Sequence, residues 1–159
     1  MPTKVILADD HRMFREMLLS VLAHKGENYV VMAEAATGKD TLDLLGHYLP
    51  DLLLLDYKMP GVSRLSAFCR QVAHRSHTTR ILIVSACAEE EVVLEAIIGG
   101  AQGYILKDAS VAEILSAIAT IQRGEPWVDP RLPASVFQAF QRGERPGSGS
   151  TLRAWQKYG

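Results

Sequence analysis

The sequence has few of the features that mark secreted, membrane-spanning or nucleic-acid-binding proteins. Its 159 residues include two cysteines, Cys69 and Cys87, which are too few for a disulfide framework and point to a reducing compartment. No apolar run approaches the roughly 20 residues that cross a bilayer, and no secretory signal precedes the first strand-like segment. The formal net charge of −1 provides no basic field for a phosphate backbone. We therefore expect a cytoplasmic protein with no membrane contact and little affinity of its own for nucleic acid.

Short apolar runs alternate with longer amphipathic stretches along most of the chain, which is typical of repeated βα units. Right-handed crossovers between such units make the strands parallel and place helices on both faces of the sheet. The run Asp51–Asp56 has no polar alternation, so we expect it to form a central strand covered on both faces. The expected strands are Lys4–Ala8, Tyr29–Ala33, Asp51–Asp56, Arg80–Val84 and Gly103–Leu106.

Capping signals mark several of the helices between these strands. Thr37 followed by Asp40 starts one helix, and Ser110 followed by Glu113 forms a capping box for another that ends near Arg123. The glycine pair at 99–100 stops the helix before it. Prolines then interrupt the chain, and one short helix is expected at Ala134–Gln141. The other helices are expected around residues 13–22, 65–73 and 89–98.

Chemically active residue types follow four of the expected strands. Asp9 and Asp10 follow the first strand, Asp56 the third, Ser85 the fourth and Lys107 the fifth. Open α/β sheets place their functional crevice at these carboxyl ends. If the first and third strands are neighbours, three carboxylates converge and repel one another, which proton uptake or a divalent cation would relieve. Oxygen ligands in a partly hydrated cleft suit Mg²⁺, and a lysine with a hydroxyl suits phosphoryl oxygens. Each residue alone could equally be a helix cap or a turn former, as Asp10 could be.

Four segments together resemble the receiver domains of two-component response regulators of the FixJ/LuxR-like class. They are 5–11 (VILADDH), 54–61 (LLDYKMPG), 83–86 (IVSA) and 99–110 (GGAQGYILKDAS), and the resemblance covers about residues 3–130. It implies a flavodoxin-like (βα)5 doubly wound parallel sheet with strand order 2-1-3-4-5 and a short C-terminal linker helix.

The resemblance also implies how the chain is divided. A receiver domain would occupy residues 1–124, and a linker with the short helix would occupy 125–146. Residues 147–159 would be a flexible tail or a remnant left by cloning, and they are too few for the helix-turn-helix output domain that usually follows. DNA would then be bound only through an output domain that this chain lacks, and phosphorylation could produce a homodimer.

Asp56 resembles the phosphoacceptor of this family, which attacks the phosphohistidine of a sensor histidine kinase to give an acyl phosphate. The implied Mg²⁺ ligands are Asp10, Asp56 and the backbone carbonyl of Lys58, with Asp9 acting through water. The protein would assist its own phosphorylation and dephosphorylation without being a turnover enzyme. We expect positioning and electrostatics to supply most of the catalysis.

The resemblance assigns switch and lifetime roles to other residues. Ser85 and Lys107 would bind the phosphoryl group, and Tyr104 would follow Ser85 by swinging inward, which repacks the face formed by the fourth helix, fifth strand and fifth helix. Lys58 and Cys87 each lie two residues past a site residue, where a side chain can overhang the phosphoryl group. We hypothesise that Lys58 slows attack by water and lengthens the phosphorylated lifetime.

One stretch departs from the family pattern, and three histidines have alternative interpretations. Ser63-Arg64 stand where the class usually carries an acidic residue and a glycine, so the loop after the phosphoacceptor could adopt another geometry and gains a charge at its rim. His11 is interpreted as a helix-start residue, and His74 and His77 as solvated surface residues without a third ligand.

Three other functions share parts of this pattern. A stand-alone or unphosphorylated receiver-like adaptor would keep the fold without the chemistry. Haloacid-dehalogenase-like phosphatases also use a nucleophilic Asp with Mg²⁺, but they want a second Asp where this chain has Lys58. A flavodoxin-like FMN carrier would need a first loop rich in Ser, Thr and Gly, whereas Asp9-Asp10 repel phosphate.

Overall fold

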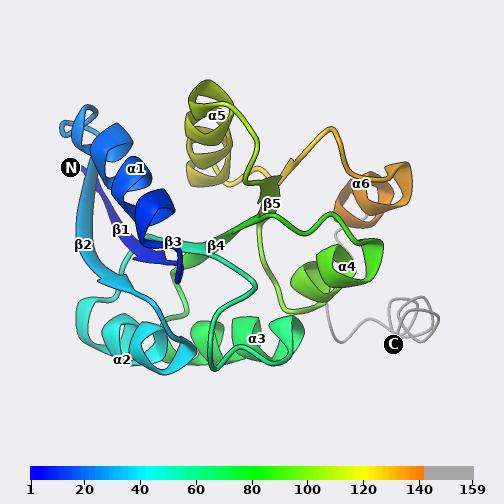
Figure 1. The fold of residues 1–159 in the computed structure, drawn as a ribbon, viewed down its shortest axis with the longest axis horizontal. Coiled ribbons are helices and arrows are strands. Elements are labelled where there is room, and N and C mark those ends of the chain that lie inside the picture. The colour runs from blue at the N-terminus through cyan, green and yellow to red at the C-terminus, as the bar shows by residue number, and fades with distance from the viewer. Residues whose placement is uncertain (142–159) are drawn as a thin grey trace.

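A six-stranded parallel sheet in the order β2-β1-β3-β4-β5-β6 organises the computed structural model, which describes residues 1–141 (Figure 1). The first five strands confirm the predicted doubly wound order. A sixth strand was not predicted, because two residues between prolines carry no alternation. The strands are β1 (Thr3–Ala8), β2 (Tyr29–Ala35), β3 (Leu52–Leu55), β4 (Arg80–Ser85), β5 (Gly103–Leu106) and β6 (Trp127–Val128).

Helices cover both faces of the sheet (Figure 1). Two of them, α1 (Arg12–Ala23) and α5 (Val111–Gln122), bury their apolar stripes on one face. The opposite face carries a second apolar cluster, which the remaining helices cover. These are α2 (Gly38–Tyr48), α3 (Leu65–Arg75), α4 (Glu90–Ile98) and α6 (Ala134–Gln141).

Strand β3 is the centre of the structure. Its four leucines are all at most 2% exposed, and the strand pairs with β1 on one side and β4 on the other. A strand with apolar side chains on both faces gains the most free energy when both faces are covered, as the missing polar alternation predicted.

The structure contains the helix-capping hydrogen bonds that the sequence predicted. The Thr37 hydroxyl accepts from the Asp40 amide at 3.1 Å, and Ser110 and Glu113 each accept from the other's backbone amide at 3.1 Å. Gly100, just past α4, has a φ of +94°, a conformation that glycine adopts without strain. The two caps fix where α2 and α5 begin, and therefore where the loops after β2 and β5 end.

The segment after α5 returns to the body of the protein. The predicted helix Ala134–Gln141 is present as α6, which packs against α4, and the Ser135 hydroxyl donates to Glu90 at 2.6 Å. The buried side chains of Leu132 and Val136 anchor the segment. No helix within residues 1–141 is long and apolar enough to span a membrane. The tail predicted at 147–159 lies outside the described residues.

Candidate functional site

Two acidic residues meet because β1 and β3 run side by side in parallel register. Ala8 pairs with Leu55 at the ends of these strands, so Asp9 and Asp56 leave the sheet at the same edge. The Asp56 amide donates to the Ala8 carbonyl at 2.8 Å, and the Asp9 amide donates to the Ala35 carbonyl of β2 at 2.9 Å. The hydrogen-bonding pattern of the sheet therefore continues past the strand ends and fixes the backbones of Asp9 and Asp56.

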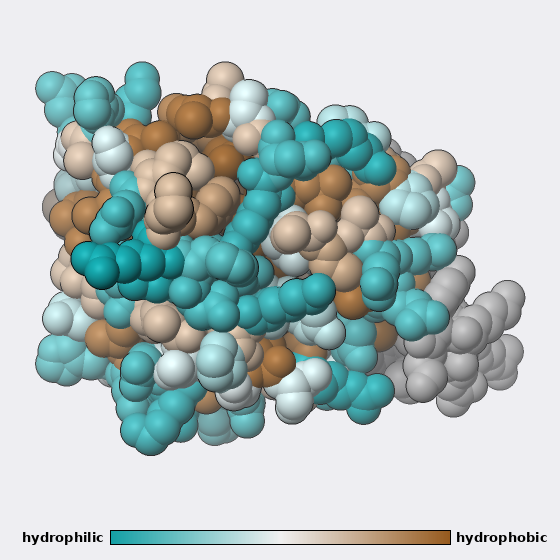
Figure 2. Space-filling view, viewed as in Figure 1, coloured by the Kyte–Doolittle hydropathy of each residue, from teal (hydrophilic) through white to brown (hydrophobic). Residues whose placement is uncertain are grey.

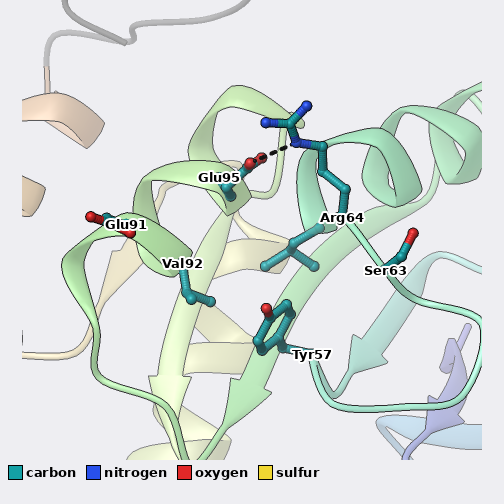
Figure 3. A pocket seen from close by; sticks show the side chains of 7 residues that line it. Tyr57, Ser63, Arg64, Glu91, Val92 and Glu95 are labelled. Atoms are coloured by element: carbon teal, nitrogen blue, oxygen red, sulfur yellow. Dashed lines mark hydrogen bonds and ion pairs between the residues drawn. The ribbon is translucent and has the colours of Figure 1, made fainter. Parts of the chain in front are cut away.

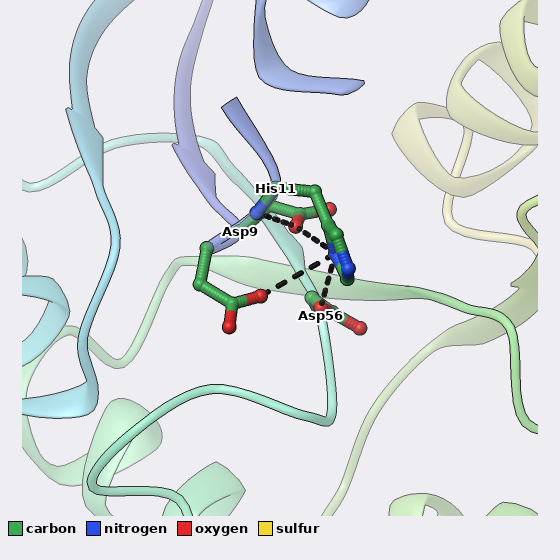
Figure 4. A group of neighbouring side chains, drawn as sticks. Asp9, His11 and Asp56 are labelled. Atoms are coloured by element: carbon green, nitrogen blue, oxygen red, sulfur yellow. Dashed lines mark hydrogen bonds and ion pairs between the residues drawn. The ribbon is translucent and has the colours of Figure 1, made fainter. Parts of the chain in front are cut away.

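Four side chains with metal-binding atoms converge at this edge (Figure 4). One ligand atom from each of Asp9, Asp10, His11 and Asp56 lies within 4.8 Å of the others. Asp9 and Asp56 are buried, whereas Asp10 and His11 face solvent. Several carboxylate oxygens with an open, hydrated side are the donor set that Mg²⁺ prefers. The residues present therefore fit a hard divalent cation.

Lys107 provides the positive charge of the site. Its ammonium lies 2.8 Å from Asp9 Oδ2 and 3.4 Å from Asp56 Oδ2, and its side chain is 14% exposed. The Lys107 amide donates to the Ser85 carbonyl at 2.9 Å, which ties the end of β5 to β4. The ammonium also lies 4.7 Å from the centre of the Phe14 ring. One ammonium facing three carboxylates leaves the site with excess negative charge.

That excess charge affects the protonation of Asp56. Burial raises the pKa of the Asp56 carboxyl, and repulsion from Asp9 raises it further. Lys107 and a hydrogen bond from the Lys58 amide, at 3.4 Å from Asp56 Oδ1, act in the opposite direction but do not cancel the rise. The ionised carboxylate of Asp56 is thus held at an electrostatic cost that an added cation would reduce.

His11 has a larger part in the site than its sequence position predicted. It is the N-cap residue of α1, which confirms its interpretation as a helix-start residue. Its Nδ1 atom also points at the acidic cluster, 3.2 Å from Asp9 Oδ1 and 3.4 Å from Asp10 Oδ1 (Figure 4). The same atom lies 3.0 Å from the Lys107 ammonium. Nδ1 accepts from Lys107 in the tautomer that leaves it unprotonated, and donates to Asp9 Oδ1 in the tautomer that protonates it. The position of His11 directly after the aspartate pair was the available signal.

Ser85, Cys87 and Tyr104 form a hydrogen-bonded group beside the cluster. The Cys87 amide donates to the Ser85 hydroxyl at 3.1 Å, and the Tyr104 hydroxyl donates to the Cys87 carbonyl at 2.6 Å. Tyr104 is fully buried, so the ring already occupies the inward position. Burial raises the pKa of its hydroxyl, and the hydrogen bond with Ser85 partly offsets this rise. The loop from β4 to α4 is therefore bonded to β5.

Arg64, the departure from the family pattern, pairs with α4 (Figure 3). Its Nε lies 3.1 Å from Glu95 Oε1, and Glu95 Oε2 accepts from the Ser66 amide at 3.2 Å in the first turn of α3. Arg64 itself makes no side-chain cap for α3, so Glu95 supplies the acceptor from another helix. The loop after Asp56 is thus tied to α4, and its Lys58 side chain is exposed.

An apolar groove lies beside the charged cluster. Met13, Phe14 and Met17 of α1 line it together with Ala86 and Lys107. Figure 2 shows hydrophobic side chains gathered over α1, above a band of hydrophilic residues that crosses the middle of this face. Met13 is 84% exposed, which is unusual for a large apolar side chain and leaves this side of the site open.

Comparison with known proteins decides the family. The model of the response regulator receiver domain matches residues 5–119. This chain belongs to the response regulator receiver domain family. The match includes the acidic cluster, Ser85 and Lys107, and it confirms the resemblance on which the predicted strand order rested.

Individual receiver-containing proteins are also similar. The oxygen regulatory protein NreC of Staphylococcus aureus is 37% identical over 138 residues, which cover 86% of this chain and 63% of NreC. This chain thus spans less than two thirds of the length of that curated relative. Among solved structures, the signal receiver domain of the putative response regulator NarL from Mycobacterium tuberculosis is 35% identical with a TM-score of 0.72, covering 78% of this chain and 98% of that one. A LuxR-family two-component response regulator from Aurantimonas sp. SI85-9A1 is 27% identical with a TM-score of 0.75, and the match covers 89% of this chain and 97% of that one.

Proposed function

We propose that this receiver domain accepts a phosphoryl group on Asp56 from a sensor histidine kinase. The observation that carries the proposal is the buried Asp56 carboxylate, which shares the Lys107 ammonium with Asp9 at the open carboxyl edge of the sheet. An Asp56 oxygen would form the new O–P bond while the P–N bond to the kinase imidazole breaks and that imidazole takes up a proton. Lys107 would bind a phosphoryl oxygen as the phosphorylated product forms.

The acidic residues would hold Mg²⁺ during this transfer. Asp10 and Asp56 would ligate it directly with the Lys58 carbonyl, and Asp9 would act through water. When bound, Mg²⁺ supplies positive charge to the phosphoryl oxygens. Asp9 and Asp10 keep the acceptor edge charged and hydrated, and β1 and β3 fix the direction from which Asp56 attacks.

The switch would run through the group beside the cluster. Ser85 would turn its hydroxyl towards a phosphoryl oxygen and give up its hydrogen bond from the Cys87 amide. Tyr104, bonded to the Cys87 carbonyl, would be locked in its inward position, and the face of α4, β5 and α5 would repack. Two charge-assisted hydrogen bonds, worth about 1.5–3 kcal/mol each, are large enough to bias such an equilibrium.

Lys58 and Cys87 would tune the phosphorylated lifetime, because both follow site residues by two positions. The exposed Lys58 side chain can overhang the phosphoryl group and hinder attack by water. We expect Lys58→Ala to lose its phosphoryl group faster than the wild type in a timed dephosphorylation assay. An unchanged or slower loss would contradict this role.

We further propose that residues 1–124 form the receiver and 125–146 the linker to an output domain. The longer NreC relative supports this division, because this chain covers 63% of it. Transcription control, DNA binding through that output domain, homodimerisation on phosphorylation and a cytoplasmic location all belong to this proposal. The chain would act as a signalling domain that assists its own phosphorylation and dephosphorylation.

The test is incubation with Mg²⁺ and a small phosphodonor, followed by a phosphate-retarding gel. We expect a retarded band for the wild type, dependent on Mg²⁺, and no such band for Asp56→Asn. An unmodified wild type would instead favour the unphosphorylated adaptor.

A further inference from the structure

A third buried carboxylate, after those of Asp9 and Asp56, lies outside the residues that match the family model. Asp129, just past β6, is 0% exposed. Its Oδ1 accepts from the Arg131 amide at 2.9 Å and from Arg131 Nε at 2.8 Å, while its Oδ2 lies 2.7 Å from Arg131 Nη2. Oδ2 also accepts from the Leu106 amide at 2.9 Å. Hydrogen bonds and an ion pair of this kind compensate the cost of burying a charged carboxylate.

The bond to Leu106 continues the sheet where β6 has stopped. β6 pairs with β5 only at Gly103 and Tyr104, and the Asp129 amide donates to the Tyr104 carbonyl at 3.0 Å. The next inward amide, that of Leu106, would have no strand partner on this side. The carboxylate of Asp129 takes the place of a strand carbonyl there.

Arg131 extends the same link past the end of β5. Its Nη1 lies 2.9 Å from Asp108 Oδ1, and its Nη2 lies 3.9 Å from Glu113 Oε2 in the first turn of α5. Leu106 and Asp108 are the two neighbours of Lys107 in the chain. The Leu106 amide and the Asp108 side chain, on the two sides of Lys107, are therefore bonded to one turn, while the Lys107 amide is bonded to Ser85 on the other side.

We propose that Asp129 and Arg131 are positioning residues that hold Lys107 for phosphoryl binding. This inference rests on the proposed function, because it assigns to Lys107 the phosphoryl oxygen. A lysine on four flexible methylenes reaches its target only as accurately as its backbone is placed, and misplacement by about 1 Å can cost about 100-fold. The Asp129–Arg131 turn fixes that backbone from a segment beyond α5.

The probe is beryllofluoride, a phosphoryl analogue, titrated calorimetrically into the full chain at saturating Mg²⁺. Mg²⁺ alone is titrated separately. We expect Arg131→Ala to weaken beryllofluoride binding by about 10-fold or more while Mg²⁺ affinity does not fall, because the metal ligands follow β1 and β3 and are held by those strands. Asp108→Asn removes only the exposed ion pair with Arg131 and should weaken beryllofluoride binding by about twofold. Arg123→Ala, whose side chain is 61% exposed and pairs loosely with Glu125, is the matched control and should behave as the wild type.

A double-mutant cycle separates positioning from general structure. In a Lys107→Ala background, Arg131→Ala should cause no further loss of beryllofluoride affinity, since the residue through which it acts is gone. Unchanged binding by Arg131→Ala, a parallel loss of Mg²⁺ affinity, or a loss that persists without Lys107 would each overturn the inference. A wild type that binds no beryllofluoride with Mg²⁺ would overturn the proposed function, and the inference with it.

Discussion

Two buried carboxylates at the carboxyl edge of the sheet, Asp56 after β3 and Asp129 after β6, have opposite electrostatic surroundings. Asp56 shares the Lys107 ammonium with Asp9, and the pKa of its carboxyl is raised by burial and by that neighbour. Burial alone would also raise the pKa of Asp129, but hydrogen bonds from Arg131 and Leu106 outweigh burial and lower it. Burial is therefore not what distinguishes the two groups.

Asp56 and Asp129 differ in whether neighbouring groups fully compensate the negative charge of the carboxylate. The Asp129 carboxylate has its charge balanced by Arg131 and both oxygens engaged, so it serves the fold. Asp56 is left with unbalanced negative charge and a solvent-facing neighbour, Asp10. A carboxylate that is incompletely compensated is stabilised by an incoming cation and is available to an electrophile. A fully compensated carboxylate is destabilised when any of its partners is removed. The same residue type can thus be functional in one place and structural in another.

The largest expected difference between the two regions is their response to Mg²⁺. At 100 times its Kd, Mg²⁺ should raise the free energy of unfolding of the wild type by about 2.7 kcal/mol. The free energy of unfolding of Asp129→Ala should rise by as much on adding Mg²⁺, because this substitution lies away from the metal ligands. The rise for Asp56→Asn should be smaller, because this variant lacks a ligand carboxylate. Urea unfolding with and without Mg²⁺ measures all three. Equal gains in the wild type and Asp56→Asn would contradict the assignment.

Removing the compensated carboxylate should destabilise the fold without metal. Asp129→Ala leaves the buried Leu106 amide without its acceptor, and we expect the free energy of unfolding to fall by about 1–3 kcal/mol. Asp43→Ala is the control, since Asp43 makes an exposed ion pair with Lys39 and its loss should cost under about 0.5 kcal/mol. If the free energy of unfolding of Asp129→Ala falls no further than that of Asp43→Ala, the Asp129 carboxylate does not stabilise the fold as proposed.

Removing the charge of Asp56 should have the opposite sign. In metal-free buffer at neutral pH, Asp56→Asn relieves repulsion from Asp9 but gives up attraction to Lys107, so we expect stabilisation on the order of 1 kcal/mol. Chelator-treated protein in a thermal melt provides the measurement. A less stable Asp56→Asn protein would mean that Lys107 already compensates the cluster.

The smallest expected effect is the pH dependence of the Asp129 contribution. A lowered pKa means that its stabilisation is complete above the unfolded value of about 3.9 and is lost as pH falls through the folded-state pKa. The groups facing it through Arg131 are Asp108 and Glu113. The stability gap between wild type and Asp129→Ala should hold from neutral pH to about 4 and narrow below it. A gap that widens on acidification would contradict the ion pair.

The sequence predicted the parts of the structure that depend on local periodicity and on parallel strands ending at one edge. The alternation of strands and helices, the caps at Thr37 and Ser110 and, once β1 and β3 are neighbours, the convergence of Asp9, Asp56 and Lys107 follow from those rules. The strand order itself came from the family resemblance, because periodicity does not fix which strands are neighbours.

Contacts between distant side chains were not predictable in the same way. Arg64 meets Glu95 across 31 positions, and Asp129 meets Leu106 across 23, with no spacing rule to connect them. β6 is too short to show alternation. The His11 ring lies against the acidic cluster, and a helix-start signal does not specify the direction of that side chain.

The most direct test of the central claim is intact-mass spectrometry after incubation with Mg²⁺ and acetyl phosphate. If the under-compensated carboxylate is the acceptor, the wild type should carry a single phosphoryl group, and Asp56→Asn none, while Asp129→Asn should still be modified. Equal phosphorylation of the wild type and Asp56→Asn would contradict the account.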